Sequence, residues 1–239
     1  MFLVAVAVAV ALGTAAQSVT GFGFALFVVP VLAVVADPKT AVVVMTSVGV
    51  PMTIANALRW RHDLDLRAAV VVTIAALVGM PFGALLLDRA DERTLTVVVG
   101  VVVLALTVAL WRGLTFPSGR ATELTAGAAS GALATSTGTN GPPLVIAFQA
   151  TGMAPEPTRA TLAAAFAVQG SLALATFWAA GLVDAEVGRA WLVGVPAAAV
   201  GALVGDRVFA RLDRARFRTS VLALLAASGV LALASTIWS

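Results

Sequence analysis

Long apolar segments separated by short charged clusters run along the whole chain. A membrane-spanning helix needs about 20 apolar residues, because it rises about 1.5 Å per residue across about 30 Å of hydrocarbon. Six segments have this length and character: residues 40–58, 68–87, 94–111, 160–182, 190–210 and 219–238. The pattern predicts a membrane-spanning helix in each of them.

Two further apolar segments suit neither one span nor two. Residues 2–36 and 121–153 are each interrupted near the middle, by QSVTGFG in the first and by TSTGTNGPP in the second. The arms that follow the breaks, 24–36 and 143–153, are too short for a full crossing. Each segment is predicted to form a hairpin, either broken or re-entrant, with its tip inside the membrane.

The two halves of the chain match each other at nearly constant offsets. The equivalent pairs are Gly21 and Gly138, Gly23 and Asn140, Lys39 and Arg159, Gly79 and Gly201, and Gly83 and Gly205, at offsets that drift from 117 to 122. This predicts a first repeat over 1–112, a connecting loop over 113–123 and a second repeat over 124–239. A hairpin followed by three spans makes the second repeat enter from the opposite side. The predicted fold is an all-α integral membrane protein with two inverted repeats.

Composition supports a membrane protein and removes several classes of function. Of the 239 residues 60% are hydrophobic and 11% are charged, and the chain has no cysteine and one histidine, His62. Disulfides and thiolate metal sites are therefore excluded, and no metal site is predicted. No His, Cys, Asp or Glu lies deep in a predicted span, so the spans offer nothing from which to build a catalytic centre. The net charge of +3 comes from arginines interspersed with carboxylates in loops, which does not indicate nucleic acid.

The basic residues divide unequally between the two predicted faces. One face has Arg59, Arg61, Arg67, Arg112, Arg120, Arg159, Arg207, Arg211, Arg214, Arg216 and Arg218. The other has Lys39, Arg89, Arg93 and Arg189. Cytoplasmic loops carry the excess of Lys and Arg, so the first face is predicted to be cytoplasmic and both termini to lie outside.

The hairpin breaks predict an anion site. Pro142 and Pro143 are tolerated in the first turn of a helix, and Asn140 or Thr139 can cap its start. Gly21 leaves the matching loop free of side-chain bulk. If the opposed tips meet, two helix N-termini point into one cavity, each with about half a positive charge and free amide donors.

Two groups of candidate residues follow. The predicted substrate contacts are Asn140, Gly141, Thr139, Gly138, Pro142, Gly21, Gly23, Thr20, Gln17 and Ser18. Lys39 and Arg159 are candidates either for basic gates or for ordinary snorkelling at a helix end. Arg207 is expected to pair with Asp206 or to meet the substrate on the inner side. Asn56 and Gln169 are second-tier candidates for the cavity wall.

The segments GTAAQSVTGFGFALFVVPVL and GALATSTGTNGPPLVIAF resemble the two glycine-rich hairpin motifs of the TauE/SafE sulfite exporter family, also called toluene sulfonate uptake permeases. The resemblance spans nearly the whole chain. It implies a bacterial inner-membrane transporter of sulfite, sulfonates or other small organic anions. The chain departs from the commoner pattern of adjacent glycines, with Gly21-Phe22-Gly23 in one half and Asn140-Gly141-Pro142 in the other, so the substrate stays open.

The resulting hypothesis is a secondary transporter that moves a small anion by alternating access. A channel-like anion pore is the alternative, and an integral-membrane enzyme or an assembly subunit is the weaker one. No cofactor is expected. A coupling ion, H⁺ or Na⁺, is left open, although no carboxylate lies deep in a span to relay protons. The expected partners are the anion and the lipid bilayer, and a homodimer is left open.

Overall fold

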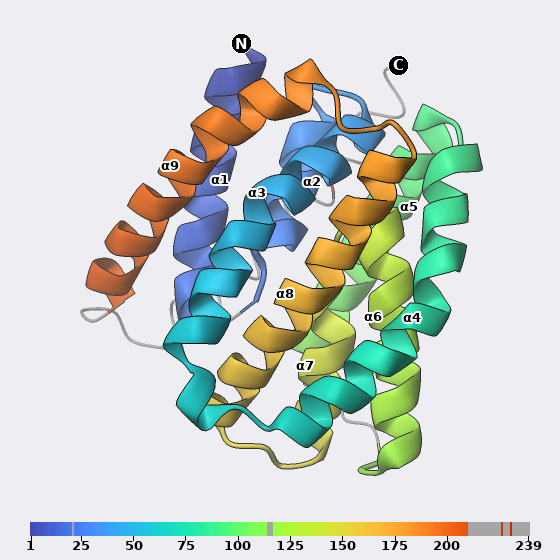
Figure 1. Cartoon of the computed structure of the whole chain (residues 1–239), viewed down its shortest axis with the longest axis vertical. Helices are drawn as coiled ribbons and strands as arrows, with labels where there is room; N and C mark the ends of the chain where they lie inside the picture. The colour runs from blue at the N-terminus through green and yellow to red at the C-terminus, as the bar shows by residue number, and fades with distance from the viewer. Residues whose placement is uncertain (21, 114–116, 210–225, 227–229, 231–239) are drawn as a thin grey trace.

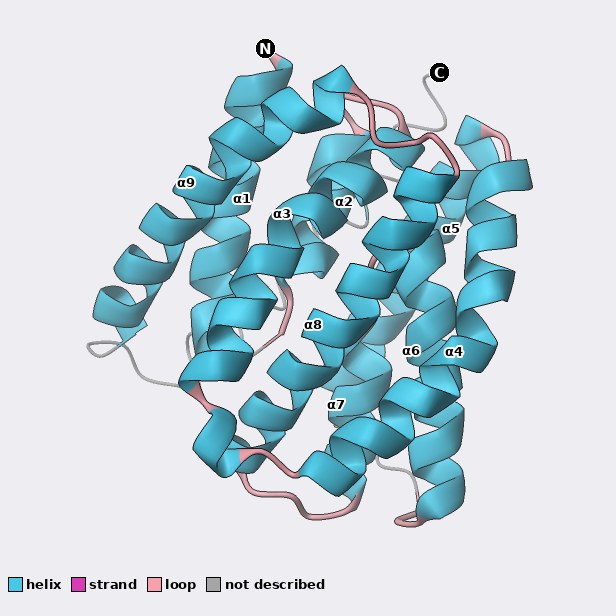
Figure 2. Ribbon diagram, in the orientation of Figure 1, coloured by secondary structure: helices cyan, strands magenta, loops and turns pink. Residues whose placement is uncertain are grey.

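The chain folds into a bundle of helices that run along roughly one direction (Figure 1). The computed structural model describes residues 1–20, 22–113, 117–209, 226 and 230, and it contains no strand among them (Figure 2). The helices in order are α1 (Phe2–Thr20), α2 (Phe24–Ala33), α3 (Pro38–Arg59), η1 (Arg61–Asp63), α4 (Leu66–Arg89), α5 (Glu92–Trp111), α6 (Arg120–Ser136), α7 (Gly141–Ala150), α8 (Pro155–Ala179) and α9 (Ala185–Phe209).

Five of the described helices are long and apolar enough to cross a membrane. They are Pro38–Arg59, Leu66–Arg89, Glu92–Ala109, Pro155–Ala179 and Ala185–Gly205. These five agree with five of the six segments predicted from hydropathy, and the sixth, 219–238, lies outside the described residues. The prediction of an all-α membrane protein is therefore confirmed.

Several helices begin earlier than the apolar pattern indicates, because aspartates cap their first turns. Asp37 accepts a hydrogen bond from the amide of Thr40, and Asp65 accepts one from that of Ala68, both at 2.9 Å. Asp184 accepts from the amide of Val187 at 2.9 Å, so α9 starts at Ala185 and not at 190. A side-chain oxygen at this position satisfies a backbone N–H that the helix itself leaves unpaired.

The cap of α5 also affects a titratable group. Asp91 accepts a hydrogen bond from the amide of Thr94 at 2.8 Å. The hydrogen bonds from Thr94 hold the pKa of the Asp91 carboxyl below its ordinary value. The carboxyl is exposed to solvent.

The short helices α2 and α7 lie inside the protein. Each has 10 residues and reaches about 15 Å, half of the hydrocarbon thickness. Seven residues of α2 and seven of α7 are buried, whereas α4 exposes large apolar side chains such as Val78 and Phe82. The outer helices thus present an apolar face suited to lipid, and the interrupted backbone is covered by protein, as a membrane requires.

Two pairs of helices are packed very closely through glycines. On α4, a Cβ at Gly79 or Gly83 would overlap the carbonyl of Ala128 or Ala132 on α6. On α9, a Cβ at Gly201 would overlap the carbonyl of Ala11 on α1. Small residues let helix backbones approach in this way. These glycines therefore allow the two closest helix pairs, α4 with α6 and α1 with α9.

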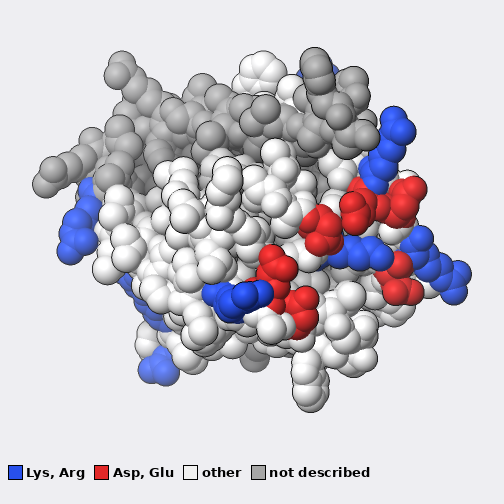
Figure 3. Space-filling model, turned by 90° about the horizontal axis from the view of Figure 1, so that it is seen from above, with Lys and Arg blue, Asp and Glu red and all other residues white. Residues whose placement is uncertain are grey.

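Helices that the sequence offsets pair with one another run in opposite directions. In Figure 1, α3 begins near the upper end and α8 near the lower end. Likewise α4 runs upward and its counterpart α9 runs downward, while α1 descends from the N-terminus and α6 rises. Figure 3, which looks onto the upper end, shows acidic and basic side chains intermixed at its rim.

Candidate functional site

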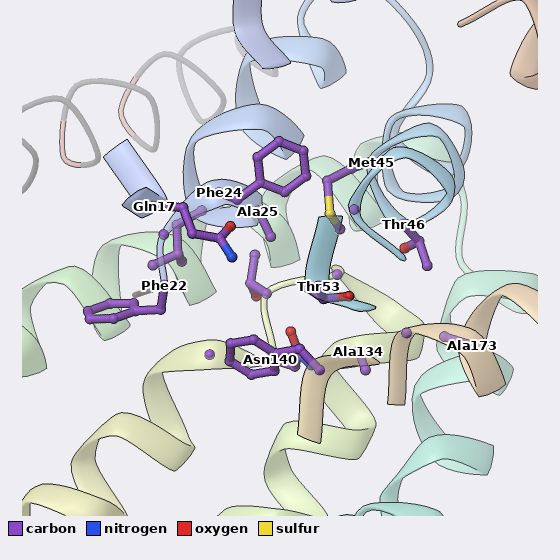
Figure 4. A pocket seen from close by; sticks show the side chains of 18 of the residues that line it. Gln17, Phe22, Phe24, Ala25, Met45, Thr46, Thr53, Ala134, Asn140 and Ala173 are labelled. Carbon is purple, nitrogen blue, oxygen red and sulfur yellow. The ribbon is translucent and has the colours of Figure 1, made fainter. Parts of the chain in front are cut away.

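A cavity of about 70 Å³ lies where the breaks of the two hairpins meet. A single water needs about 10–15 Å³ on this scale, so the cavity has room for a small molecule of several heavy atoms. It is lined by Gln17, Phe22, Gly23, Phe24, Ala25, Leu26, Met45, Thr46, Gly49, Val50, Thr53, Ala134, Gly138, Thr139, Asn140, Gly141, Pro142, Phe166, Gly170 and Ala173. In Figure 4, Gln17 and Asn140 enter it from opposite sides.

The hairpin tips are in contact with each other. A Cβ built on Gly141 would lie 3.3 Å from the Cβ of Phe22, which belongs to the other hairpin. The starts of both short helices, at Phe24 and at Gly141, line the same cavity. The positive dipole ends of both helices therefore act on one cavity.

The two helix starts offer different donors. The amides of Phe24, Ala25 and Leu26 occupy the first turn of α2, where a helix has no carbonyl to pair with them. Gly23 precedes them with a φ of 105°, a left-handed conformation that favours glycine, and it provides no side-chain cap. In α7, Pro142 and Pro143 have no N–H to donate. Backbone donors are thus concentrated at α2, and at α7 the polar side chains must replace them.

The principal polar side chain at the start of α7 is Asn140, which is contacted by residues of α6 and α8. Its Nδ2 lies 3.1 Å from Oε1 of Gln169, a residue of α8 with 0% exposure. Ser130 of α6 lies 2.8 Å from the same Oε1 and 3.0 Å from the carbonyl oxygen of Asn140. Three helices therefore meet in one hydrogen-bonded cluster at the cavity wall.

None of the described residues that line the cavity is charged. Polar side chains come from Gln17, Thr46, Thr53, Thr139 and Asn140, and most of the remaining wall is aromatic or aliphatic. Among the described residues no group of His, Asp or Glu is arranged to hold a metal ion. The arrangement suits a small ligand held by amide and hydroxyl donors and by helix dipoles.

The structure brings most of the predicted contact residues together. Seven of them line the cavity: Gln17, Gly23, Gly138, Thr139, Asn140, Gly141 and Pro142. Ser18 lies instead in a smaller neighbouring cavity, and its hydroxyl donates to the carbonyl of Thr14 in its own helix. Thr20 ends α1, and its side chain lies outside the described part of the chain, as does Gly21.

The second-tier residues are distributed around the cavity. Gln169 stands behind Asn140, and Asn56 lines the smaller cavity together with Arg59 and Trp60. Arg207 is exposed and lies 3.5 Å from the carbonyl of Leu203 in its own helix. Its expected partner, the Asp206 side chain, lies outside the described residues.

The sequence profile of the family described as Sulfite exporter TauE/SafE matches residues 5–232. The chain belongs to this family. A relative from Cupriavidus necator, named Probable sulfite/organosulfonate exporter TauE, is 30% identical over 207 residues, covering 82% of this chain and 79% of the relative. No solved structure matches the chain.

Membership of the TauE/SafE family confirms the resemblance inferred from the hairpin motifs. It also confirms the prediction that the protein is a membrane transporter and not an enzyme, because the family consists of exporters.

Sequence reasoning missed the residues of α3 and α8 that form the side walls of the cavity, and its two candidates on these helices, Asn56 and Gln169, lie outside the lining. Thr46 and Thr53 face the cavity from α3, and Phe166 and Ala173 face it from α8. Thr46 and Thr53 are seven residues apart, which places them on one helix face. That spacing was a usable signal, but a threonine in a membrane helix commonly bonds its own backbone, as both do here.

Lys39 and Arg159 are equivalent in sequence but differ in their contacts. Lys39 donates to the carbonyl of Asp88 at 2.9 Å, near the exposed end of α4. Arg159 donates to the carbonyl of Ser18 at 3.1 Å and lies 4.4 Å from the ring centroid of Trp60. Arg159 therefore contacts the last turn of α1 before the break, whereas Lys39 stays at the rim.

We predict that Arg159→Gln lowers the initial rate of transport in proteoliposomes about tenfold, because it removes both a hydrogen bond and a cation–π contact. The matched change Lys39→Gln is expected to alter the rate less than about twofold, since an exposed interaction contributes little. Equal losses in the two variants would contradict this difference.

A second prediction concerns Gly138, which has a φ of 69°. A Cβ there would be strained by about 1–2 kcal/mol and would overlap the terminal methyl of Met45, which lines the cavity. Gly138→Ala should lower the thermal unfolding midpoint and also weaken anion binding, because Met45 has to move. The control is Gly152→Ala, where φ is 71° and nothing lies within 4 Å. It should lower the midpoint and leave binding unchanged.

Proposed function

We propose that this protein is a secondary transporter that carries sulfite, an organosulfonate or a related small organic anion across the bacterial inner membrane by alternating access. The anion is held between the tips of two opposed hairpins. The observation that carries this proposal is the single cavity shared by the starts of α2 and α7, with no charge among its described lining residues. The name of the C. necator relative supports sulfite and organosulfonates as the first ligands to test.

An inverted repeat, with units 1–112 and 124–239 joined by a loop over 113–123, is the second part of the proposal. Most of the cavity lining falls into equivalent pairs. At an offset of 117 these are Gln17 and Ala134, Phe22 and Thr139, Gly23 and Asn140, Phe24 and Gly141, and Ala25 and Pro142; at 120 they are Thr46 and Phe166, Val50 and Gly170, and Thr53 and Ala173. The opposite directions of equivalent helices support a pseudo-twofold axis through the cavity.

The lining is equivalent in position but unequal in chemistry. Gln17, Thr46 and Thr53 correspond to apolar residues in the second half. Asn140 and Thr139 correspond to Gly23 and Phe22 in the first. We infer that a bound anion lies with its oxygens toward the α2 amides and Asn140. An uncharged site of this kind holds an anion without the tight ion pair that an arginine would make, which favours release.

For the transport movement, we propose that the α1–α9 pair rocks against the α4–α6 pair. Each pair is locked by glycine contacts and combines helices of both repeats. The helices α3 and α8 pack against each other and line the cavity between the pairs. No carboxylate is present among the described lining residues. Export of an anion from an inside-negative cell needs no coupling ion, because each charge gains about 2.3 kcal/mol per 100 mV.

The proposed orientation places the lower end of Figure 1 in the cytoplasm and both termini outside. The loop between α3 and α4 and the described ends of the loop between α5 and α6 lie at that end. Arg59, Arg61, Arg67, Arg112 and Arg120 belong to these loops or to their flanking turns. Basic residues accumulate in this way on the cytoplasmic side.

The test of this function is sulfite flux in proteoliposomes containing the purified protein. A carrier should show saturable uptake of radiolabelled sulfite and counterflow, in which unlabelled sulfite or methanesulfonate inside the vesicle accelerates uptake of the label. Flux that rises linearly with concentration and shows no counterflow would identify an anion pore. Absence of flux for both anions would contradict transport of this class of substrate.

A further inference from the structure

The hydrogen-bonded cluster behind Asn140 contains a conflict between its protons and its acceptors. Ser130 has one hydroxyl proton, yet its oxygen lies within hydrogen-bond distance of two acceptors, the Asn140 carbonyl and Gln169 Oε1. Only one of these contacts can be a good hydrogen bond at a time. In addition, Gln169 Nε2 is buried and has no hydrogen-bond partner. A buried N–H₂ group without partners is costly.

Exchanging the oxygen and nitrogen of both amides removes this conflict. Gln169 Nε2 then donates to the Ser130 hydroxyl and to Asn140 Oδ1, and the Ser130 proton goes to the Asn140 carbonyl. The buried group left without a partner is now the Gln169 Oε1 oxygen, and an under-satisfied carbonyl is better tolerated than an orphaned N–H. The heavy atoms keep their positions, because the two ends of an amide are nearly equal in size.

The exchange also changes what Asn140 presents to the cavity. With its oxygen bound to Gln169, the Nδ2 group is directed away from Gln169 and becomes a donor of two N–H groups at the cavity wall. In the opposite orientation an amide oxygen lines the cavity there, and it would repel the oxygens of an anion.

We propose that Ser130 and Gln169 are positioning residues that fix the Asn140 side chain with its N–H₂ group toward the ligand. The inference rests on the proposed anion-binding function of the cavity. Asn140 then supplies the donors that Pro142 and Pro143 remove from the first turn of α7. Ser130 lies on α6 and Gln169 on α8, so the orientation of the Asn140 amide depends on how these two helices pack.

The chain allows a direct spectroscopic test, because it has only two asparagines, Asn56 and Asn140. Protein labelled with ¹⁵N at asparagine and placed in nanodiscs gives two side-chain N–H₂ signals, and the Asn140→Ala variant assigns them. Titration with methanesulfonate should shift the Asn140 N–H₂ protons downfield in a saturable manner. Binding is measured in parallel by equilibrium dialysis of radiolabelled methanesulfonate.

The positioning role is tested with two variants of matched chemistry. Ser130→Ala should raise the dissociation constant for methanesulfonate about tenfold and reduce the downfield shift of the Asn140 N–H₂ protons. Ser171→Ala is the control, since its hydroxyl donates only to the carbonyl of Ala167 in its own helix, and it should leave both quantities unchanged. Gln169→Leu should reproduce the effect of Ser130→Ala from the other side of the cluster.

The outcomes separate this inference from the proposed function. If the wild-type protein binds methanesulfonate and the Asn140 N–H₂ signal does not move, the orientation is wrong while the anion site stands. The same conclusion follows if Ser130→Ala and Gln169→Leu both bind with wild-type affinity. If the wild-type protein binds neither methanesulfonate nor sulfite, the proposed function is wrong. The positioning role of Ser130 and Gln169 is then wrong too, because it requires an anion bound at Asn140.

Discussion

Asn140→Leu is expected to reduce sulfite flux in proteoliposomes at least about 100-fold while the protein stays folded. Leucine removes the amide that faces the cavity at the start of α7 and fills its place with an apolar group. A hydrogen bond to a charged group contributes about 1.5–3 kcal/mol, and the leucine side chain also occupies space that the anion needs. Both effects act on the same position, so this is the largest functional effect that we predict for a single substitution.

The matched control for this change is Gln149→Leu. Gln149 lies on α7, the short helix that Asn140 precedes, but it is exposed and does not line the cavity. Gln149→Leu also replaces an amide by leucine, but at an exposed position. The flux of this variant should therefore stay within about twofold of wild type, as is usual for surface substitutions. Near-normal flux through Asn140→Leu would remove Asn140 from the binding site.

The largest expected effect on stability is that of Gly83→Ala. The new methyl group would overlap the carbonyl of Ala132 and the hydroxyl of Thr135, so α4 and α6 would have to separate. Backbone atoms cannot move aside as a flexible side chain does. We therefore expect the free energy of unfolding to fall by about 3 kcal/mol. Thermal unfolding monitored by size-exclusion chromatography in detergent should show a much lower midpoint or aggregated protein.

Gly188→Ala is the control for this substitution. Gly188 also lies in a helix, α9, but nothing lies within 4 Å of a Cβ at this position. Alanine favours a helix over glycine by up to about 1 kcal/mol, so the midpoint should rise slightly or stay constant. A Gly83→Ala protein as stable as Gly188→Ala would show that α4 and α6 are not in the close contact described here.

Much of the fold was predictable because membrane helices and breaks in them leave strong sequence signals. The apolar lengths gave the spans, and the glycines and prolines of TSTGTNGPP gave the start of α7 two residues from its expected position. The ends of the spans were less accurate because capping residues such as Asp184 are charged, and hydropathy excludes them from the helix that they begin.

The parts of the site that were not predictable depend on contacts between distant segments. Ser130 and Gln169 are 39 residues apart, and neither residue alone indicates that it binds Asn140. The difference between Lys39 and Arg159 has a similar origin. Arg159 stacks on Trp60, and the position equivalent to Trp60 in the other half is Ala180, which offers Lys39 no ring. The sequence offset between the two halves paired these cations by position and could not predict their partners.

The central claim is that one small anion binds between the two hairpin tips, at amides of α2 and the side chain of Asn140. The most direct measurement is an experimental structure of the protein in lipid nanodiscs with bound methanesulfonate. The account predicts ligand density within hydrogen-bond distance of the amides of Phe24 to Leu26 and of Asn140 Nδ2. Density found only in the smaller cavity beside Arg59 and Trp60, with the space between the tips filled by side chains, would contradict it.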